Sequence, residues 1–260
     1  MDLASYVDNL ASRGVYHFTT DEATAALGSS PVAVRAAIRR SRAKGRLAMP
    51  FRGFHVFVPP EYRALGCLPG EQFIPQLMER LGLVYYAGLL SAARLHGAAH
   101  QAPMVFQVVA RDNRPDIHCG RVRVEFVARQ NVADIPIVQK NTPRGILRVS
   151  SPEATTFDLI GYPSHAGGLS NVATLIAELA ESLDPHKLLA ETAHSPLPWT
   201  QRLGYLLELV GAPGRAALLE KHVAGHAKEY TPLRPGKPSG RASRDTRWRL
   251  LINDTVEPDL

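Results

Sequence analysis

Basic side chains recur at helical spacing between residues 31 and 46. Arg35, Arg39 and Arg42 occupy positions i, i+4 and i+7, which lines three guanidinium groups along one side of a helix. Guanidinium groups can fork onto guanine edges or neutralise phosphates, so such a helix suits the major groove of DNA. With neighbouring hydroxyls and cations they make up the predicted DNA-binding set: Thr20, Ser29, Ser30, Arg35, Arg39, Arg40, Arg42, Lys44, Arg46 and Arg52.

Capping signals mark the ends of the helices that would carry these DNA-binding residues. Residues 19–22, Thr-Thr-Asp-Glu, have the spacing of a capping box and start a short helix that Gly28 ends. Ser30–Pro31 supplies an N-cap serine and a proline at the first helical position, and this second helix runs to Gly45. With an earlier helix over residues 3–12, the pattern predicts a helix-turn-helix on a small three-helix core.

A β-hairpin is predicted directly after the second helix. Residues 46–49 and 54–58 indicate two strands, and residues 50–53 supply the turn with Arg52 at its tip. A hairpin after a recognition helix is a wing, so residues 1–62 are predicted to form a winged helix-turn-helix domain. The alternative, a plain three-helix core whose arginines are merely solvated, stays open at this point.

The remaining residues, 70–260, predict a larger mixed α+β domain with a helical C-terminal part. Strands grouped in the middle of the chain, with helices around them, favour the α+β class over a doubly wound sheet. The expected elements are helices at 71–81 and 86–95, strands at 104–110, 121–128, 135–139 and 145–149, and helices at 151–160, 170–183, 185–193, 199–210 and 213–225.

The first part of a basic stretch near the C-terminus, residues 231–244, is expected to lack regular secondary structure. Residues 231–244 are rich in proline, glycine, serine and basic residues, which indicates a loop or extended arm. For the basic arm 231–249, contact with nucleic acid is one alternative, and a solvated flexible segment is the favoured one. Residues 247–252 could add one last strand.

The net charge, the length of the apolar runs and the cysteine count favour some classes of protein over others. The formal net charge of +6 favours a polyanionic partner. Residues 1–60 hold eight basic against four acidic side chains, and residues 228–249 hold seven against two, so positive charge lies at the two ends. No apolar run reaches the roughly 18 residues that cross a bilayer, and no signal peptide is recognisable. We therefore expect a cytoplasmic protein without a membrane partner, and with only Cys67 and Cys119 we expect no disulfide framework.

Several residue pairs could suggest catalysis, but each has a structural explanation. Glu153 and Asp158 are five apart, which is poor spacing for a shared metal, and Glu153 suits a helix start. His96 and His100 lack a third ligand nearby, and His118–Cys119 is expected in a hairpin turn. No serine-hydrolase elbow, Walker loop or dinucleotide fingerprint is present. No catalytic residue, metal or cofactor is predicted, although an enzyme of nucleic-acid metabolism, a nuclease or nucleotidyltransferase-like, is kept as the alternative.

Segments spread over the whole chain resemble the AbiEi family of antitoxins. They follow one another in the same order through nearly the full length, and the one departure is His55, where a tyrosine is expected in the wing strand. The segments are Phe18–Ala23, Arg52–Val56, Tyr85–Ala93, His96–Ala99, Ser150–Thr155, Phe157–Leu159, Gly167–Gly168, Asn171–Thr174 and Gln201–Glu208.

The resemblance implies an operon-encoded antitoxin of abortive infection and related stress systems, paired with a nucleotidyltransferase-like toxin. In that family the winged domain binds inverted repeats in double-stranded promoter DNA and represses its own operon. The C-terminal domain is required for antitoxin action. Members have been described as type IV antitoxins, for which a stable complex with the toxin is not required.

Overall fold

The computed structural model describes residues 1–98 and 105–259, which pack into two compact units. Unit 1 is built from the first 86 residues and from two later segments that end at Gln130 and Arg148. Unit 2 contains the segments between them and everything from Val149 on. Because the chain enters unit 1 three times, these units do not correspond to continuous stretches, and the domain limits 1–62 and 70–260 stay a prediction.

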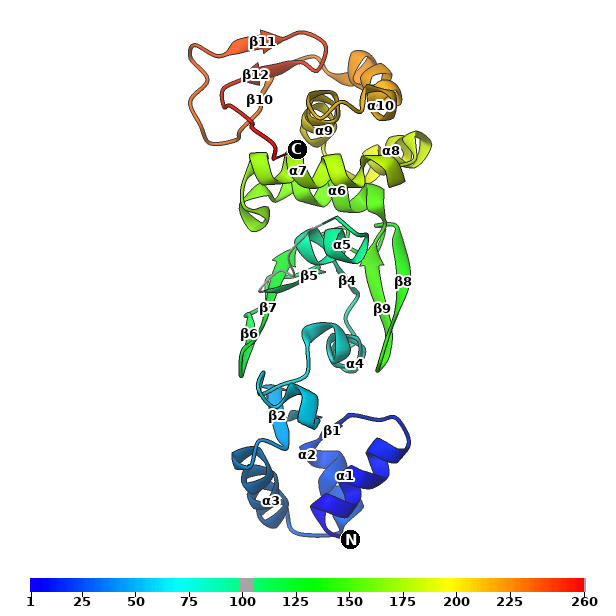
Figure 1. Cartoon of the computed structure of the whole chain (residues 1–260), viewed down its shortest axis with the longest axis vertical. Helices are drawn as coiled ribbons and strands as arrows, with labels where there is room; N and C mark the ends of the chain where they lie inside the picture. Colours follow the sequence, from blue (N-terminus) through cyan, green and yellow to red (C-terminus); the bar gives the residue numbers. More distant parts are fainter. Residues whose placement is uncertain (99–104, 260) are drawn as a thin grey trace. The chain divides into compact units, whose positions relative to one another are not determined.

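A winged helix-turn-helix forms the first part of unit 1 (Figure 1). Its helices close on an apolar core that includes Phe18, Val34 and Ile38, and its strands form an antiparallel sheet in the order β1-β3-β2. The predicted helices and hairpin are therefore confirmed. The elements are α1 Leu3–Ser12, β1 His17–Thr19, α2 Thr20–Leu27, α3 Pro31–Ala43, β2 Leu47–Phe51 and β3 Phe54–Phe57.

Local caps explain where α2 and α3 begin. Thr19 and Glu22 form a capping box: the N–H of Glu22 donates to Thr19 Oγ1 at 3.2 Å, and the N–H of Thr19 donates to Glu22 Oε2 at 2.7 Å. Gly28 ends α2 in the left-handed conformation, with φ of 58°, which a residue without Cβ adopts readily. Ser30 then caps α3 by accepting the N–H of Ala33 at 3.3 Å.

The hairpin turn is tighter than the sequence predicts. Strand β2 continues through Pro50 to Phe51, so Arg52 and Gly53 alone form the turn. Proline is tolerated there because β2 is an edge strand of its sheet. The short strand β1 was not predicted, because three residues are too few for an alternating pattern and their partner β3 lies far along the chain.

A second sheet contains six strands in the order β6-β7-β5-β4-β9-β8. Strands β5 and β7 pair in parallel whereas β6 and β7 pair antiparallel, so the sheet is mixed and the predicted α+β class is confirmed. The elements of this region are α4 Ile74–Arg80, β4 Tyr85–Ala87, β5 Phe106–Ala110, β6 Ile117–Cys119, β7 Val122–Ala128, β8 Ile137–Thr142 and β9 Gly145–Ser150.

The predicted helix 86–95 is wrong in its first part. Ala87 pairs with Val149 of β9, so the start of this segment belongs to strand β4. The helix α5 begins only at Leu89, after Gly88, and ends at Leu95. The segment is apolar throughout, and an apolar run by itself does not distinguish a buried strand from a buried helix.

The predicted turn at His118–Cys119 is also wrong. Both residues lie in strand β6, and the turn falls on Gly120, whose φ is 58°. The predicted strand 104–110 is confirmed from Phe106 onward, while Met104 lies outside the described residues.

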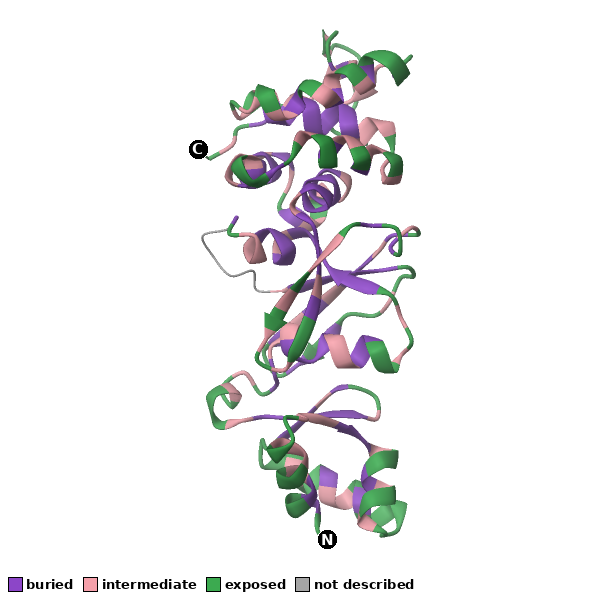
Figure 2. Cartoon of the chain, turned by 90° about the vertical axis from the view of Figure 1, so that its right-hand side faces the viewer, coloured by how far each residue is buried: buried purple, intermediate pink, exposed green. Residues whose placement is uncertain are grey.

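Unit 2 is mainly helical in its described part, as predicted. Buried residues, purple in Figure 2, gather where these helices face one another, and α6 is buried from Glu153 to Ile160. Ser151 caps α6 by accepting the N–H of Ala154 at 3.2 Å, which is the predicted serine-proline start. After α5, its helices are α6 Pro152–Gly161, α7 Leu169–Leu179, α8 Pro185–Glu191, α9 Leu197–Leu209 and α10 Pro213–His226.

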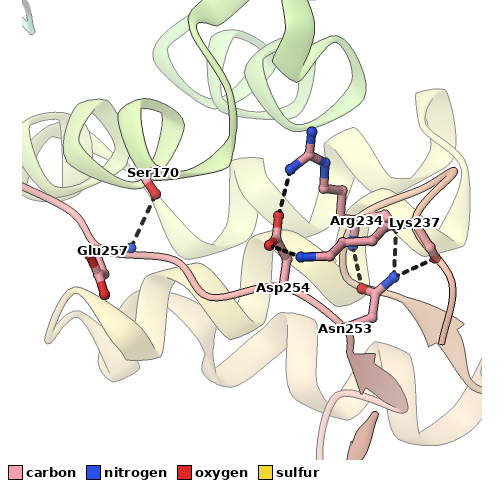
Figure 3. Close-up of polar contacts among 6 residues, drawn as sticks. All are labelled: Ser170, Arg234, Lys237, Asn253, Asp254 and Glu257. Atoms are coloured by element: carbon pink, nitrogen blue, oxygen red, sulfur yellow. Dashed lines mark hydrogen bonds and ion pairs between the residues drawn. The ribbon is translucent and has the colours of Figure 1, made fainter. Parts of the chain in front are cut away.

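The prediction of a loop is confirmed for residues 233–242, which are largely exposed, and the predicted last strand is confirmed at Leu250–Ile252. The stretch 231–249 is nevertheless not a free arm throughout, because short strands form within it. This stretch contributes to a three-stranded sheet in the order β10-β12-β11, in which Thr231–Pro232 is β10, Ser243–Asp245 is β11 and Leu250–Ile252 is β12. Asp254 accepts from Arg234 at 3.0 Å and from Lys237 at 2.6 Å (Figure 3). The pattern was misleading because the carboxylates that neutralise these cations lie outside the basic stretch itself.

Candidate nucleic-acid interface

Helix α3 carries three exposed arginines on the flank that faces the hairpin. Val34 and Ile38 turn inward, with 1% and 4% of their surface exposed, and anchor the helix in the core. Arg35, Arg39 and Arg42 are all exposed, and none of them forms an ion pair with another described residue. We call these three residues the arginine stripe. The contact of Arg42 shows that the stripe lies on the hairpin side of α3, because its Nη1 lies 3.9 Å from the Met49 sulfur in β2.

A second group of cations lies on the other flank of α3. A helix turns by about 100° per residue, so Arg40 and Lys44 point away from the arginine stripe. Together with Arg46 they line a cavity of about 410 Å³ beside α1, which also contains the carboxylates of Asp2 and Asp8. We call Arg40, Lys44 and Arg46 the α1-side cations. The structure therefore divides the six predicted cations of this region into two groups, and only the second lies beside acidic residues.

The predicted hydroxyl residues are already engaged in local hydrogen bonds. Ser30 Oγ accepts the N–H of Ala33, and Ser29 Oγ donates to the carbonyl of Leu27 at 3.3 Å. Both serines are exposed at the start of α3, where backbone N–H groups suit a phosphate. Thr20 is half-buried, and its Oγ1 lies 3.0 Å from Nε2 of His55 in β3.

Arg52 occupies the hairpin turn as predicted and is exposed. The hairpin does not project beyond its neighbours, because β1 pairs with β3 up to the partners Thr19 and Phe54, next to the turn. The turn also rests on the start of α2, where the N–H of Thr20 donates to the carbonyl of Gly53 at 3.2 Å. Arg52 lines a cavity of about 300 Å³ with Thr20 and Arg80.

Sequence reasoning missed one residue that positions the winged helix within unit 1. Arg144, in the turn between β8 and β9, stacks its guanidinium on the ring of Tyr16 at 4.1 Å and donates to Gln72 Oε1. Its backbone carbonyl accepts from Gln76 Nε2 at 2.5 Å. An arginine in a hairpin turn is usually solvated, so the sequence carried no signal for this contact.

His55 is buried in β3 and is held neutral in the folded protein. Burial, together with the nearby charge of Arg42, lowers the pKa of His55 to about 4. Its Nε2 pairs with Thr20, while its buried Nδ1 has no partner among the described residues. A proton on this ring would therefore place an unpaired donor and a charge in the core.

We expect His55 to make folding stability depend on pH. The unfolded chain takes up a proton on this ring below about pH 6.5 whereas the folded protein does not, so stability is full above that pH and falls as the pH drops toward 4. The loss between pH 7 and pH 5 should be about 2 kcal/mol. Urea unfolding at several pH values measures it, and His55→Gln should flatten the profile.

Part of the pH dependence should remain in His55→Gln, because burial also lowers the pKa of His17. The matched control is His118→Gln, which removes an exposed histidine of β6 and should leave the profile as in the wild type. An unchanged slope in His55→Gln would show that His55 takes up its proton equally readily in the folded and the unfolded state, which would contradict the prediction.

The residues considered for catalysis lie in structural positions. Glu153 and Asp158 in α6 are 3% and 0% exposed, and Glu153 Oε1 accepts the N–H of Asp184 at 3.0 Å. His96 is the C-cap residue that follows α5, and its Nε2 lies 2.7 Å from the carbonyl of Ser150, whereas His100 lies outside the described residues. Within residues 1–98 and 105–259, no three His, Cys, Asp or Glu side chains gather as metal ligands would.

Among the residues that the structure describes, no helix combines the length and the apolar character that spanning a membrane requires.

Comparisons with known proteins agree with this arrangement. A family model described as a transcriptional regulator, AbiEi antitoxin, matches residues 5–58, and the model of the AbiEi antitoxin C-terminal domain matches residues 86–209. The crystal structure of the RV2827C protein from Mycobacterium tuberculosis shares the fold, with a TM-score of 0.69 and 21% identity over 95% of this chain and 89% of that one. No curated protein matches. The first model covers α3 and both strands of the hairpin, and the second begins at β4 and ends with α9. The chain therefore belongs to the AbiEi antitoxin family.

Proposed function

We propose that this protein binds inverted repeats in the promoter of its own operon and thereby represses transcription. The observation that carries the proposal is the arginine stripe: three exposed guanidinium groups without carboxylate partners, on the second helix of a helix-turn-helix and beside a hairpin. This surface has the charge and the shape that a duplex requires. Ser29, Ser30, Thr20, the α1-side cations and Arg52 complete the proposed contact surface, chiefly at phosphates.

We infer further that the chain protects its cell, in the cytoplasm, from a nucleotidyltransferase-like toxin encoded in the same operon. The match of residues 86–209 to the AbiEi antitoxin C-terminal domain supports this role. Those residues include α6, whose carboxylates Glu153 and Asp158 are closed off from solvent. Because these two carboxylates have no access to a substrate, they favour a protective role without catalysis at this position over the alternative of a hidden nuclease or nucleotidyltransferase.

A two-part assay in cells tests the proposal with the full chain. Expression of the protein should lower the output of a reporter placed behind the DNA upstream of its own gene. Expression with the neighbouring toxin gene should restore growth, and a pull-down from the same cells reports whether the two proteins stay bound. We use the full chain because Arg144 stacks on Tyr16 of the winged helix, so a truncation at residue 70 would remove a packed contact of the remaining part.

The two activities should separate in one variant. Replacement of the arginine stripe by alanine should abolish repression and leave growth rescue largely intact, because these side chains lie outside the segment that matches the C-terminal domain. Reporter output that the wild-type protein leaves unchanged would contradict the repressor role. Growth that is not restored would contradict the antitoxin role.

A further inference from the structure

Val32 is exposed on α3 in a way that neither folding nor packing explains. It is the second residue of the helix, and 70% of its surface is accessible, the highest value for a large apolar side chain among the described residues. A β-branched residue at this position also gives the helix no advantage in propensity. Most of this apolar side chain therefore makes no packing contact within the chain.

Val32 lies on the same side of α3 as Arg35 and Arg39 of the arginine stripe. Residues three, four and seven positions apart lie on one side of a helix, which groups Val32 with Arg35, Ala36 and Arg39. Val34 and Ile38 turn to the opposite side and are buried. Val32 is therefore the apolar end of the outward surface whose basic part is the arginine stripe.

This mixture of groups suits the floor of the major groove. Residues near the N-terminus of a recognition helix reach base edges, and the C5-methyl of thymine is the one apolar group that the major groove offers. A second copy of this chain is a poor occupant, because its arginine stripe would meet like charges. One valine is also far smaller than the apolar patches that proteins use for docking.

We propose that Val32 contacts a thymine methyl group and so determines base preference at one position of each operator half-site. The inference rests on the proposed function and extends it to a base type. Arg35 and Arg39, one and two turns further along α3, then contact guanine edges or phosphates next to that thymine.

Replacing thymidine by deoxyuridine tests the contact, because it removes only the methyl group from the base. The promoter fragment is prepared with either nucleotide, and the affinity of the full-length protein is measured by fluorescence anisotropy. Wild-type protein should bind the deoxyuridine fragment about fivefold more weakly, as expected for the loss of one buried methyl group. Val32→Ala should lose about the same factor on thymidine DNA and should not distinguish the two fragments.

The control variant is Val84→Ala, which removes an apolar side chain that is 43% exposed and lies outside the winged helix. It should behave as the wild type on both fragments. The inference fails if the wild type binds both fragments equally, or if Val32→Ala still loses the same factor on deoxyuridine. If the wild type does not prefer the promoter fragment to a scrambled duplex, the proposed function itself fails.

Discussion

Replacing Arg35, Arg39 and Arg42 together by alanine is expected to weaken promoter binding about a thousandfold, since three contacts on the order of 1.4 kcal/mol each are lost. The fold should survive, because all three side chains are exposed and alanine favours a helix. Salt dependence gives a second readout. If five or six phosphates are neutralised per protein, log affinity should fall with log salt at a slope of roughly −5 in the wild type and roughly −2 in the variant.

The α1-side cations provide a control of equal charge. Replacing Arg40, Lys44 and Arg46 by alanine removes the same number of positive charges from the same helix region. Because these cations lie on the other flank, near Asp2 and Asp8, we expect a smaller loss that is uniform across DNA sequences. The arginine-stripe variant should instead lose its preference for the promoter over scrambled DNA. Equal loss of preference in both variants would mean that net charge alone drives binding.

The elements around the candidate interface were predictable because their signals are local. The capping box at Thr19 and Glu22, the serine-proline start at Ser30 and the glycine at position 28 each act within one helical turn. The same logic located the start of α6 at Ser151. Such signals depend on neighbouring residues alone, so a sequence contains all the information that they need.

The elements that were missed depend on partners that are distant along the chain. Strands β1 and β4 are each three residues long, and each pairs with a strand far along the chain. Strand β6 is the exception, because its partner β7 follows directly after the turn at Gly120; its three residues are simply too few to show an alternating pattern. The basic arm also depends on distant partners, since Arg247 pairs with Glu208 at 2.5 Å and with Glu220 at 2.6 Å. Charge patterning within a short window cannot show such long-range neutralisation.

The candidate interface was predictable in composition but not in arrangement. Helical spacing grouped Arg35, Arg39 and Arg42 correctly on one side of α3. It gave no means of telling that this side faces the hairpin, or that Arg40 lies beside α1, because both facts depend on tertiary packing.

Trp248 is expected to make the largest single contribution to the stability of unit 2. Its indole ring is 0% exposed, its Nε1 donates to Glu208 Oε2 at 2.8 Å, and its carbonyl accepts from Gln201 Nε2 at 3.1 Å. Both partners belong to α9, so this residue joins the C-terminal sheet to the helices. Trp248→Ala should lower the free energy of unfolding by about 3–5 kcal/mol, measured by urea unfolding followed by far-UV circular dichroism.

A glycine of α9 supplies the complementary test. A Cβ added at Gly204 would lie 1.9 Å from the Trp248 ring, whereas nothing lies within 4 Å of a Cβ added at Gly225 in α10. Gly204→Ala should therefore destabilise unit 2 by about 3 kcal/mol, and the control Gly225→Ala should be neutral or stabilise the helix by up to about 1 kcal/mol. In the Trp248→Ala background the cost of Gly204→Ala should largely disappear, because the ring that it strikes has gone. If the two losses were simply additive, the ring would not be packed against α9, and the C-terminal sheet would have to be held to the helices by its ion pairs instead.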